Sequence, residues 1–251
     1  MSIGEHLDEL RRRLFWSVGY WIAFSLLAGY YADLVMEWVL TPFMEALEKS
    51  GQPAEVIYIG PTDSFTVVFK VILISGAFLA SPLIAREAWG FVAAGLYGRE
   101  KRLVTLAAPL SFLLFAGGAL FFYVWVLPPA VDFLYNYGRD FFPGRPEWMV
   151  VQKPNIPDAV SFFLWMSFAM GLVFQLPLVM YFLSRLGMVR ARTFARFQRH
   201  FILGATVVAA IITPTGDAVT LSFFMLPILA LFYLGLLAVW LRERGDAEGA
   251  S

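Results

Sequence analysis

Long apolar runs recur along the whole chain and are separated by shorter polar segments. Five of these runs are near or above the roughly 20 residues that an α-helix needs to cross the hydrocarbon core of a bilayer. The pattern therefore predicts an all-α integral membrane protein, with residues 1–251 forming one polytopic domain. The candidate spans cover approximately residues 14–32, 66–85, 103–127, 159–184, 201–212 and 218–241.

The fifth run, residues 201–212, is unusually short for a membrane span. At the rise of an α-helix it reaches only about 18 Å. Such a run either re-enters the bilayer from one side or crosses it where the bilayer is locally thinned. The sixth run, residues 218–241, is long enough to tilt across the membrane.

The distribution of positive charge decides between these two alternatives. If all six runs cross and the N-terminus lies in the cytoplasm, most of the 19 Lys and Arg residues fall on inner segments, as the positive-inside rule expects. If residues 201–212 did not cross, Arg242 and Arg244 would lie outside. We therefore expect six crossings with both termini in the cytoplasm. We also expect the first run to be a retained span, because no clear small-residue cleavage site follows it.

Two long segments, residues 33–65 and 128–158, fall on the outer side in this topology. Both carry apolar and aromatic residues among prolines and glycines, and Pro42 interrupts the apolar side of the first segment. Short helices lying at the outer interface, anchored by aromatic side chains, fit this composition. We expect these segments to form external caps on the helical bundle.

The stretch before the first span has the pattern of a charged amphipathic helix. Its apolar residues recur at helical spacing, and its charged residues fall on the other side. Glu9 precedes Arg13, and Asp8 precedes Arg12, by four residues, which is the favourable order for ion pairs along a helix. The apolar positions are Ile3, Leu7, Leu10 and Leu14, and the charged ones include Glu5, Glu9, Arg12 and Arg13.

Composition narrows the chemistry that this chain can perform. Hydrophobic residues make up 59% and charged residues 15% of the chain, against about 25% charged in soluble domains. The absence of cysteine excludes disulfides, thiolate metal sites and cysteine nucleophiles. Phosphate-binding-loop, zinc-protease and serine-hydrolase motifs are also absent. We therefore expect no enzyme activity, no catalytic residue, no cofactor and no metal site, and the zero net charge gives no indication of a nucleic-acid partner.

Two carboxylates, Glu9 and Glu100, stand among basic residues on the inner side. One interpretation is local charge neutralisation at a solvated interface. The other is that they receive an arriving cation, since guanidinium groups favour bidentate carboxylate partners and such pairs strengthen where they are partly desolvated. Phe91 and Leu96, shortly before Glu100, would then accommodate apolar residues of the ligand.

Few polar groups lie within the spans. Lys70 is near the outer end of its span and can extend to the interface. Gln175 lies well inside the fourth span, either hydrogen-bonded to another helix of the protein or exposed to a partner's helix. The Thr213–Asp217 stretch suits a tight external turn that caps the sixth helix through Asp217.

Several motifs resemble those of the TatC family, the receptor component of the twin-arginine protein translocase. His6-Leu7-Asp8-Glu9-Leu10-Arg11 resembles its N-terminal H-L-x-E-L-R motif. Residues 91–102 resemble its first cytoplasmic loop, F-x-x-P-x-L-x-x-x-E-[RK]-[RK]. Ser81-Pro82, Phe174-Gln175-Leu176-Pro177 and Thr213-Pro214…Asp217 follow in the family's order, as do the six spans and the short fifth span.

The resemblance implies a receptor that binds paired-arginine signal peptides of folded cargo at the cytoplasmic face of a bacterial inner membrane. It also implies recruitment of the single-span partners TatA and TatB, self-association, a concave scaffold, and transport driven by the proton-motive force. Glu9 and Glu100 would meet the two arginines, Arg11 and Arg102 would position the loops, and Phe91 and Leu96 would line the contact. Partner helices would dock at Gln175, Pro177 and Thr213, while Pro42, Pro82 and Asp217 would be structural.

Two residues depart from the family pattern. Gln175 stands where the family commonly has a carboxylate, so a neutral hydrogen-bonding role is expected there. Ala94 replaces the proline of the loop motif. A secondary transporter of a small solute is the alternative function, but it requires polar groups near the bilayer midplane, where the sequence offers little beyond Gln175.

Overall fold

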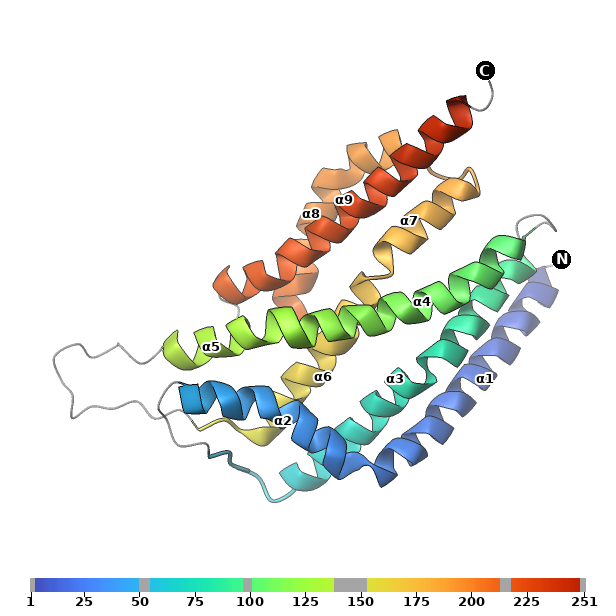
Figure 1. The fold of residues 1–251 in the computed structure, drawn as a ribbon. Coiled ribbons are helices and arrows are strands. Elements are labelled where there is room, and N and C mark those ends of the chain that lie inside the picture. The colour runs from blue at the N-terminus through green and yellow to red at the C-terminus, as the bar shows by residue number, and fades with distance from the viewer. Residues whose placement is uncertain (1–2, 50–54, 97–100, 138–152, 213–217, 249–251) are drawn as a thin grey trace. The chain divides into compact units, whose positions relative to one another are not determined.

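The computed structural model describes residues 3–49, 55–96, 101–137, 153–212 and 218–248 (Figure 1). Every regular element among these residues is helical, which confirms the predicted all-α fold. The helices are α1 (Ile3–Tyr30), α2 (Ala32–Lys49), α3 (Asp63–Ala94), α4 (Lys101–Phe121), the π-helical η1 (Phe122–Val126), α5 (Leu127–Tyr137), α6 (Ile156–Val173), α7 (Leu176–Arg185), α8 (Ala191–Ile212) and α9 (Ala218–Glu248).

Within these described ranges, four helical stretches are long and apolar enough to cross a membrane: Asp63–Ala94, Val104–Asn136, Ile156–Arg185 and Ala218–Asp246. A fifth span results if α1 and α2, which meet at a bend of 80°, are taken together. The predicted fifth run is the second half of α8, which begins ten residues earlier at Ala191. The six-span topology and the orientation of the termini stay predictions.

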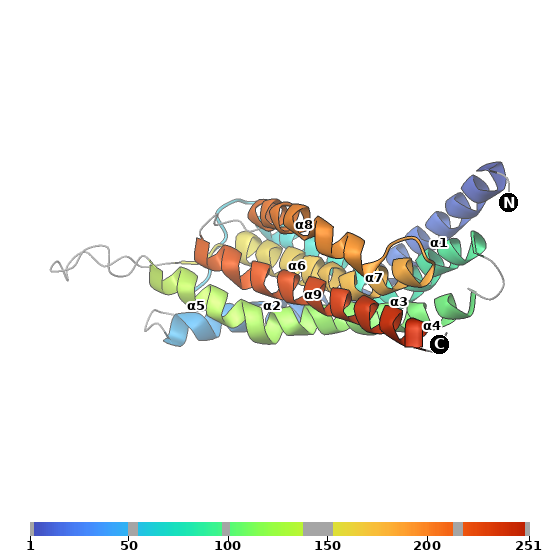
Figure 2. The same ribbon diagram turned by 90° about the horizontal axis from the view of Figure 1, so that it is seen from above.

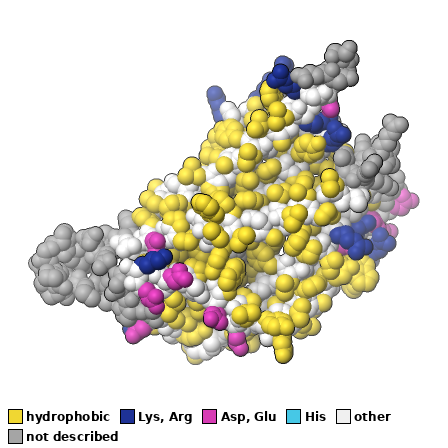
Figure 3. All heavy atoms as spheres, viewed as in Figure 1, with side chains coloured by type: hydrophobic (Ala, Val, Ile, Leu, Met, Phe, Trp, Pro, Cys, Tyr) yellow, Lys and Arg dark blue, Asp and Glu magenta, His cyan; other side chains and the backbone are white. Residues whose placement is uncertain are grey.

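The chain divides into two compact units. We call residues 21–80 and 120–168 the central unit, and residues 1–20, 81–119 and 169–251 the terminal unit. The surface in Figure 3 is dominated by hydrophobic side chains, and large apolar residues such as Phe15 and Ile211 are more than three-quarters exposed. Such a surface suits contact with lipid or with partner helices.

The central unit contains the helices predicted as external caps. Helix α2 buries Val39, Phe43 and Leu47, and Trp38 stacks on Tyr123 with 4.3 Å between ring centroids. Helix α2 continues through Pro42, so this proline does not end the helix. A proline removes one helical hydrogen bond, and burial of the flanking residues offsets that loss.

Two further contacts in the central unit were not predicted. Lys70 is half-buried, and its Nζ donates to Ser161 Oγ at 2.8 Å. The two predicted external segments pair with each other, since Ile57 bridges Asn155 and Lys153 lies 2.5 Å from Glu55. The Lys153 ammonium lowers the pKa of the Glu55 carboxyl.

In the terminal unit, α7, α8 and α9 pack around the buried residues Met180, Ala191, Phe232 and Val239. Helices α8 and α9 contact each other and run side by side in Figure 1, and Figure 2 shows the same helices turned by 90°. Phe201 of α8 stacks on Phe232 of α9 with 4.2 Å between ring centroids. A Cβ added at Gly235 would lie 2.7 Å from Met180 Sδ. This glycine therefore permits the close approach of α7 and α9.

Candidate functional site

The first turns of α1 carry Glu9 within reach of two arginines. Arg13 lies 2.7 Å from Glu9 Oε1, and Arg12 Nη2 lies 2.8 Å from Glu9 Oε2. The predicted Glu9–Arg13 pair is therefore confirmed. The predicted Asp8–Arg12 pair is wrong, because Arg12 turns to Glu9, where its guanidinium joins a carboxylate already held by Arg13.

Arg13 also joins α1 to α3. Its Nη1 lies 3.0 Å from Oε2 of Glu87, a carboxylate whose side chain is only 11% exposed. A Cβ at Gly90, one turn after Glu87, would overlap the Arg13 guanidinium, so glycine leaves the space that this cation occupies. Sequence reasoning missed Glu87 and Gly90. The available signal was an acidic residue and a glycine three positions apart near the end of an apolar helix.

The aromatic residue of the loop motif lies against the N-terminal motif. Phe91, in the last turn of α3, stacks on His6 with 4.4 Å between centroids. Helix α3 ends at Ala94, and Leu96 donates its backbone N–H to Ala93 at 3.2 Å. Both Phe91 and Leu96 are half-buried. Phe91 thus lies on the helix that pairs with α1 through Glu87, and Leu96 follows two residues after the end of that helix.

The other predicted site residues lie away from the contact between α1 and α3 or fall outside the described residues. Arg11 is exposed and shares a surface hollow with Phe15 and Trp16. Glu100 falls outside the described residues, and for Arg102 only the backbone, in the first turn of α4, is described. The structure therefore brings Glu9 and Phe91 to one pair of helices, while Glu100 stays a prediction.

The electrostatics of the site favour an ionised Glu9. The hydrogen bond from Arg13 holds the pKa of the Glu9 carboxyl below its usual value of 4.5, and the charges of both arginines act in the same direction. A carboxylate that binds two guanidinium groups has the chemistry needed to recognise an arginine. No cluster of three or more His, Asp or Glu side chains is placed to hold a metal ion within the described ranges.

Gln175 lies at the break between α6 and α7. Its Nε2 donates to the Ser111 carbonyl of α4 at 3.0 Å, and a longer contact of 3.4 Å reaches the Gly171 carbonyl. Ser111 Oγ accepts a hydrogen bond from Trp89 Nε1 at 2.6 Å. The structure thus shows the internal hydrogen bond that was one of the two alternatives for Gln175, and it links α3, α4 and α7.

The remaining predicted positions have structural surroundings of different kinds. Pro177 lies in the first turn of α7, where a missing N–H costs no helical hydrogen bond. Pro82 lies within the continuous helix α3. Thr213 and Asp217 fall outside the described residues.

Comparison with known proteins agrees with the motifs. The family model for the Sec-independent protein translocase protein TatC matches residues 5–227. The TatC protein of Koribacter versatilis (strain Ellin345) is 34% identical over 256 residues, which cover 100% of this chain and 91% of the relative. The TatC protein of Aquifex aeolicus (strain VF5) is 35% identical over 248 residues, which cover 99% and 98% of the two chains.

The fold agrees as well. A crystal structure described as the twin arginine translocase receptor TatC matches with a TM-score of 0.81 and 32% identity, over 94% of this chain and 98% of that chain. The resemblance found in the motifs is therefore confirmed. The chain belongs to the TatC family and is a multi-pass membrane component of the Sec-independent protein translocase.

Proposed function

We propose that this protein is the receptor that binds paired-arginine signal peptides of folded cargo at the cytoplasmic face. The observation that carries this proposal is the Glu9 carboxylate, which binds two guanidinium groups within 2.8 Å. Solved TatC structures are described as twin arginine translocase receptors, which supports the same role here. Glu9 and Glu100 are the proposed partners of the two peptide arginines.

The two arginines on Glu9 differ in how firmly they are held. The Arg12 side chain is 65% exposed, whereas that of Arg13 is 20% exposed and has Glu87 as a second partner. Exposed ion pairs contribute little to stability, so a peptide arginine can displace Arg12 at small cost. Arg13 stays between Glu9 and Glu87 and fixes the direction of the Glu9 carboxylate.

Neighbouring residues supply the rest of the proposed contact. Phe91 and Leu96 would pack against apolar residues that accompany the paired arginines. Arg11 and Arg102 would position the surrounding segments. The stacking of Phe91 on His6 supports this arrangement, because it holds the end of α3 against the N-terminal motif that carries Glu9.

The proposed topology has six crossings, with the second half of α8 as the short fifth span and both termini in the cytoplasm of a bacterium. Leu203 and Ile211 in that half are 67% and 78% exposed, as expected for side chains that face lipid. Helix α2 and the segment before α9, with Asp217, would form the external side of a concave scaffold.

Single-span partners of the TatA and TatB type would dock on the helices around Gln175, Pro177 and Thr213. The hydrogen bond from Gln175 to the Ser111 carbonyl supports this proposal, since it holds the start of α7 against α4 and so positions the helices on which a partner would dock. Such partners, together with self-association of the receptor and the proton-motive force, would carry out export.

Cross-linking of a twin-arginine signal peptide to membranes that contain the protein tests the receptor proposal. Glu9→Ala combined with Glu100→Ala is expected to abolish specific cross-links. Asp8→Ala is the matched control, because it removes an exposed carboxylate one residue away on the same helix. Undiminished specific cross-linking in the double variant would overturn the assignment of the site.

A secondary transporter of a small solute is not favoured. Such a transporter needs polar groups near the midplane that can bind the solute, and the Gln175 amide group donates to Ser111 within the protein. Solute uptake into proteoliposomes that contain only this protein would support the transporter instead.

A further inference from the structure

The two carboxylate oxygens of Glu9 are bound by different arginines. Arg13 directs both its Nε and its Nη2 at Oε1, each at 2.7 Å. Arg12 Nη2 lies 2.8 Å from Oε2 and also reaches Oε1 at 3.0 Å. Within the part of the chain that the structure describes, Arg12 is the one partner of Oε2. The protein's own guanidinium therefore occupies one half of the carboxylate.

The two arginines differ in what else holds them. Arg13 has Glu87 as a second partner at 3.0 Å, whereas Arg12 has Glu9 alone among the described residues. The Arg12 side chain is also mostly exposed. An exposed side chain with a single charged partner gives up that partner at little cost. A guanidinium that arrives at Oε2 therefore replaces Arg12 and leaves Arg13 in place.

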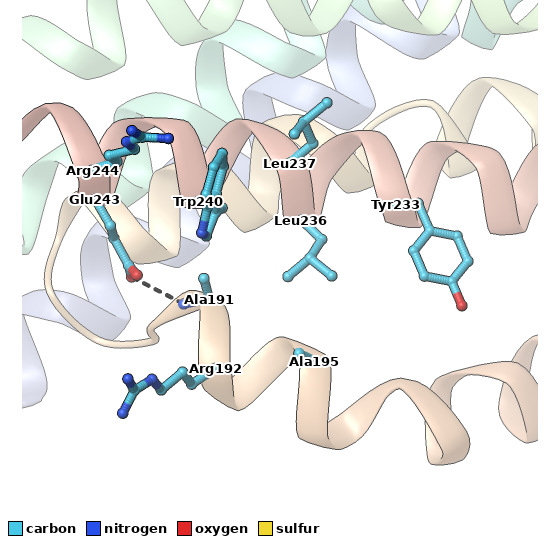
Figure 4. Close-up of a pocket in the computed structure, with 9 residues that line it drawn as sticks. All are labelled: Ala191, Arg192, Ala195, Tyr233, Leu236, Leu237, Trp240, Glu243 and Arg244. Carbon is cyan, nitrogen blue, oxygen red and sulfur yellow. Dashed lines mark hydrogen bonds between the residues drawn. The ribbon is translucent and has the colours of Figure 1, made fainter.

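A second carboxylate of the terminal unit shows that such pairing is not automatic. Glu243 of α9 accepts the backbone N–H of Ala191 at 2.9 Å and so holds the start of α8 (Figure 4). The next residue, Arg192, is exposed, yet its side chain points away from this carboxylate in Figure 4. Glu243 is thus used by the fold, whereas Oε2 of Glu9 is occupied by a group that a ligand can replace.

We propose that Arg12 is an intramolecular competitor of the signal peptide. It occupies Oε2 of Glu9 in the empty receptor, and a guanidinium of the peptide displaces it into solvent. This inference rests on the proposed function, because it requires that Glu9 receives an arginine of the peptide. Since every ligand of Oε2 displaces the same side chain, Arg12 lowers the affinity of all such ligands by one common factor.

The strength of the Arg12–Glu9 pair sets the size of this factor. From the usual strength of exposed ion pairs, Arg12 should weaken ligand binding about two- to sixfold. Two other roles for Arg12 lead to different results. If Arg12 contacted the bound peptide favourably, its removal would weaken binding. If it only repelled a cationic peptide through its charge, its removal would tighten binding whether or not Glu9 is present.

Binding of a synthetic paired-arginine signal peptide to the purified protein in lipid nanodiscs distinguishes these roles. Arg12→Gln should tighten binding about two- to sixfold. The same factor should apply to peptides in which either arginine is replaced by lysine. In a Glu9→Gln background, adding Arg12→Gln should give no gain, because the neutral amide no longer holds Arg12 as an ion pair.

Arg86→Gln is the matched control for charge. It removes an exposed arginine next to Glu87 that has no partner among the described residues, and it should leave binding within about 1.5-fold, because an exposed charge without contact is screened by salt. Unchanged or weaker binding by Arg12→Gln, an equal gain in Arg86→Gln, or a gain that persists with Glu9→Gln would overturn the competition.

The same measurements separate this inference from the receptor proposal. If Glu9→Gln weakens binding but Arg12→Gln does not tighten it, Glu9 remains the peptide's partner and only the competitor role is lost. If Glu9→Gln binds the peptide as tightly as the wild type does, both proposals are overturned.

Discussion

The guanidinium of Arg13 lies between two carboxylates, Glu9 at 2.7 Å and Glu87 at 3.0 Å, on neighbouring helices. Buried and half-buried charges persist only where partners compensate for lost hydration. Glu87 therefore depends on Arg13, and Arg13 depends on the space that Gly90 leaves beside it. These three residues hold the Glu9 carboxylate in a defined direction before any ligand arrives.

Gly90→Ala should destabilise the protein by displacing Arg13 from this space. Overpacking of a tight site costs about 1–3 kcal/mol. In an Arg13→Ala background, the same Gly90→Ala change should cost much less, because the overlapping guanidinium is gone. Thermal unfolding of the four proteins in detergent measures this coupling. Equal costs in both backgrounds would show that Arg13 does not occupy the space beside Gly90.

The pairing of Glu9 with Arg13 should also shape the pH dependence of stability. Because the pKa of the folded Glu9 carboxyl lies below 4.5, its stabilisation is complete above that pH and is lost as the pH falls through the lowered pKa. The stability difference between the wild type and Glu9→Gln should therefore be constant from about pH 8 to about pH 5.5. A difference that shrinks within this interval would contradict the pairing.

Among the helices, the break between α6 and α7 shows what hydrophobic periodicity can and cannot predict. The apolar run 159–184 was predicted correctly as one hydrophobic stretch, but its division into two helices was not. Pro177 has no backbone N–H to donate to the preceding turn. The side-chain amide of Gln175 donates to a backbone carbonyl of α4. The partner of Gln175 could not be predicted, because periodicity gives the faces of a helix and not the neighbour on each face.

Gln175→Leu should weaken association with single-span partners while leaving signal-peptide binding intact. The change removes the hydrogen bond to the Ser111 carbonyl, worth on the order of 1 kcal/mol, and it loosens the contact of α7 with α4. Co-purification of partners and peptide cross-linking, measured on the same membranes, report the two functions separately. Ser111→Ala is the matched control, since it removes the Trp89 bond but keeps the carbonyl. Lost peptide binding with unchanged partner association would contradict this prediction.

At the scale of the whole molecule, the apolar runs predicted the helical membrane fold, and the motifs predicted the family. The apolar runs could predict the fold because a segment that crosses lipid must satisfy its own backbone hydrogen bonds, which a long apolar helix does. Contacts between distant segments were not predictable in the same way. The Arg13–Glu87 pair and the Ile57–Asn155 bridge join residues far apart in the sequence. The start of α8 at Ala191 was also not predicted, because its first half is basic and does not share the hydrophobic pattern of residues 201–212.

The absence of cysteine makes the topology directly testable. Single cysteines introduced as Glu55→Cys and Arg190→Cys should react with membrane-impermeant thiol reagents from opposite sides. Glu55→Cys should be labelled in intact cells from outside, and Arg190→Cys only after the membrane is opened. Labelling of both positions from one side would contradict six crossings with both termini in the cytoplasm.

The most direct measurement of the receptor role is a double-mutant cycle between Glu9→Gln in the protein and Arg→Lys changes in the paired arginines of a signal peptide. If Glu9 binds one of these guanidinium groups, Arg→Lys at that position should weaken binding to the wild-type protein at least tenfold. The same change should have little further effect on the Glu9→Gln variant, because the bidentate partner is gone. Independent, additive losses at both peptide arginines would contradict direct recognition by Glu9.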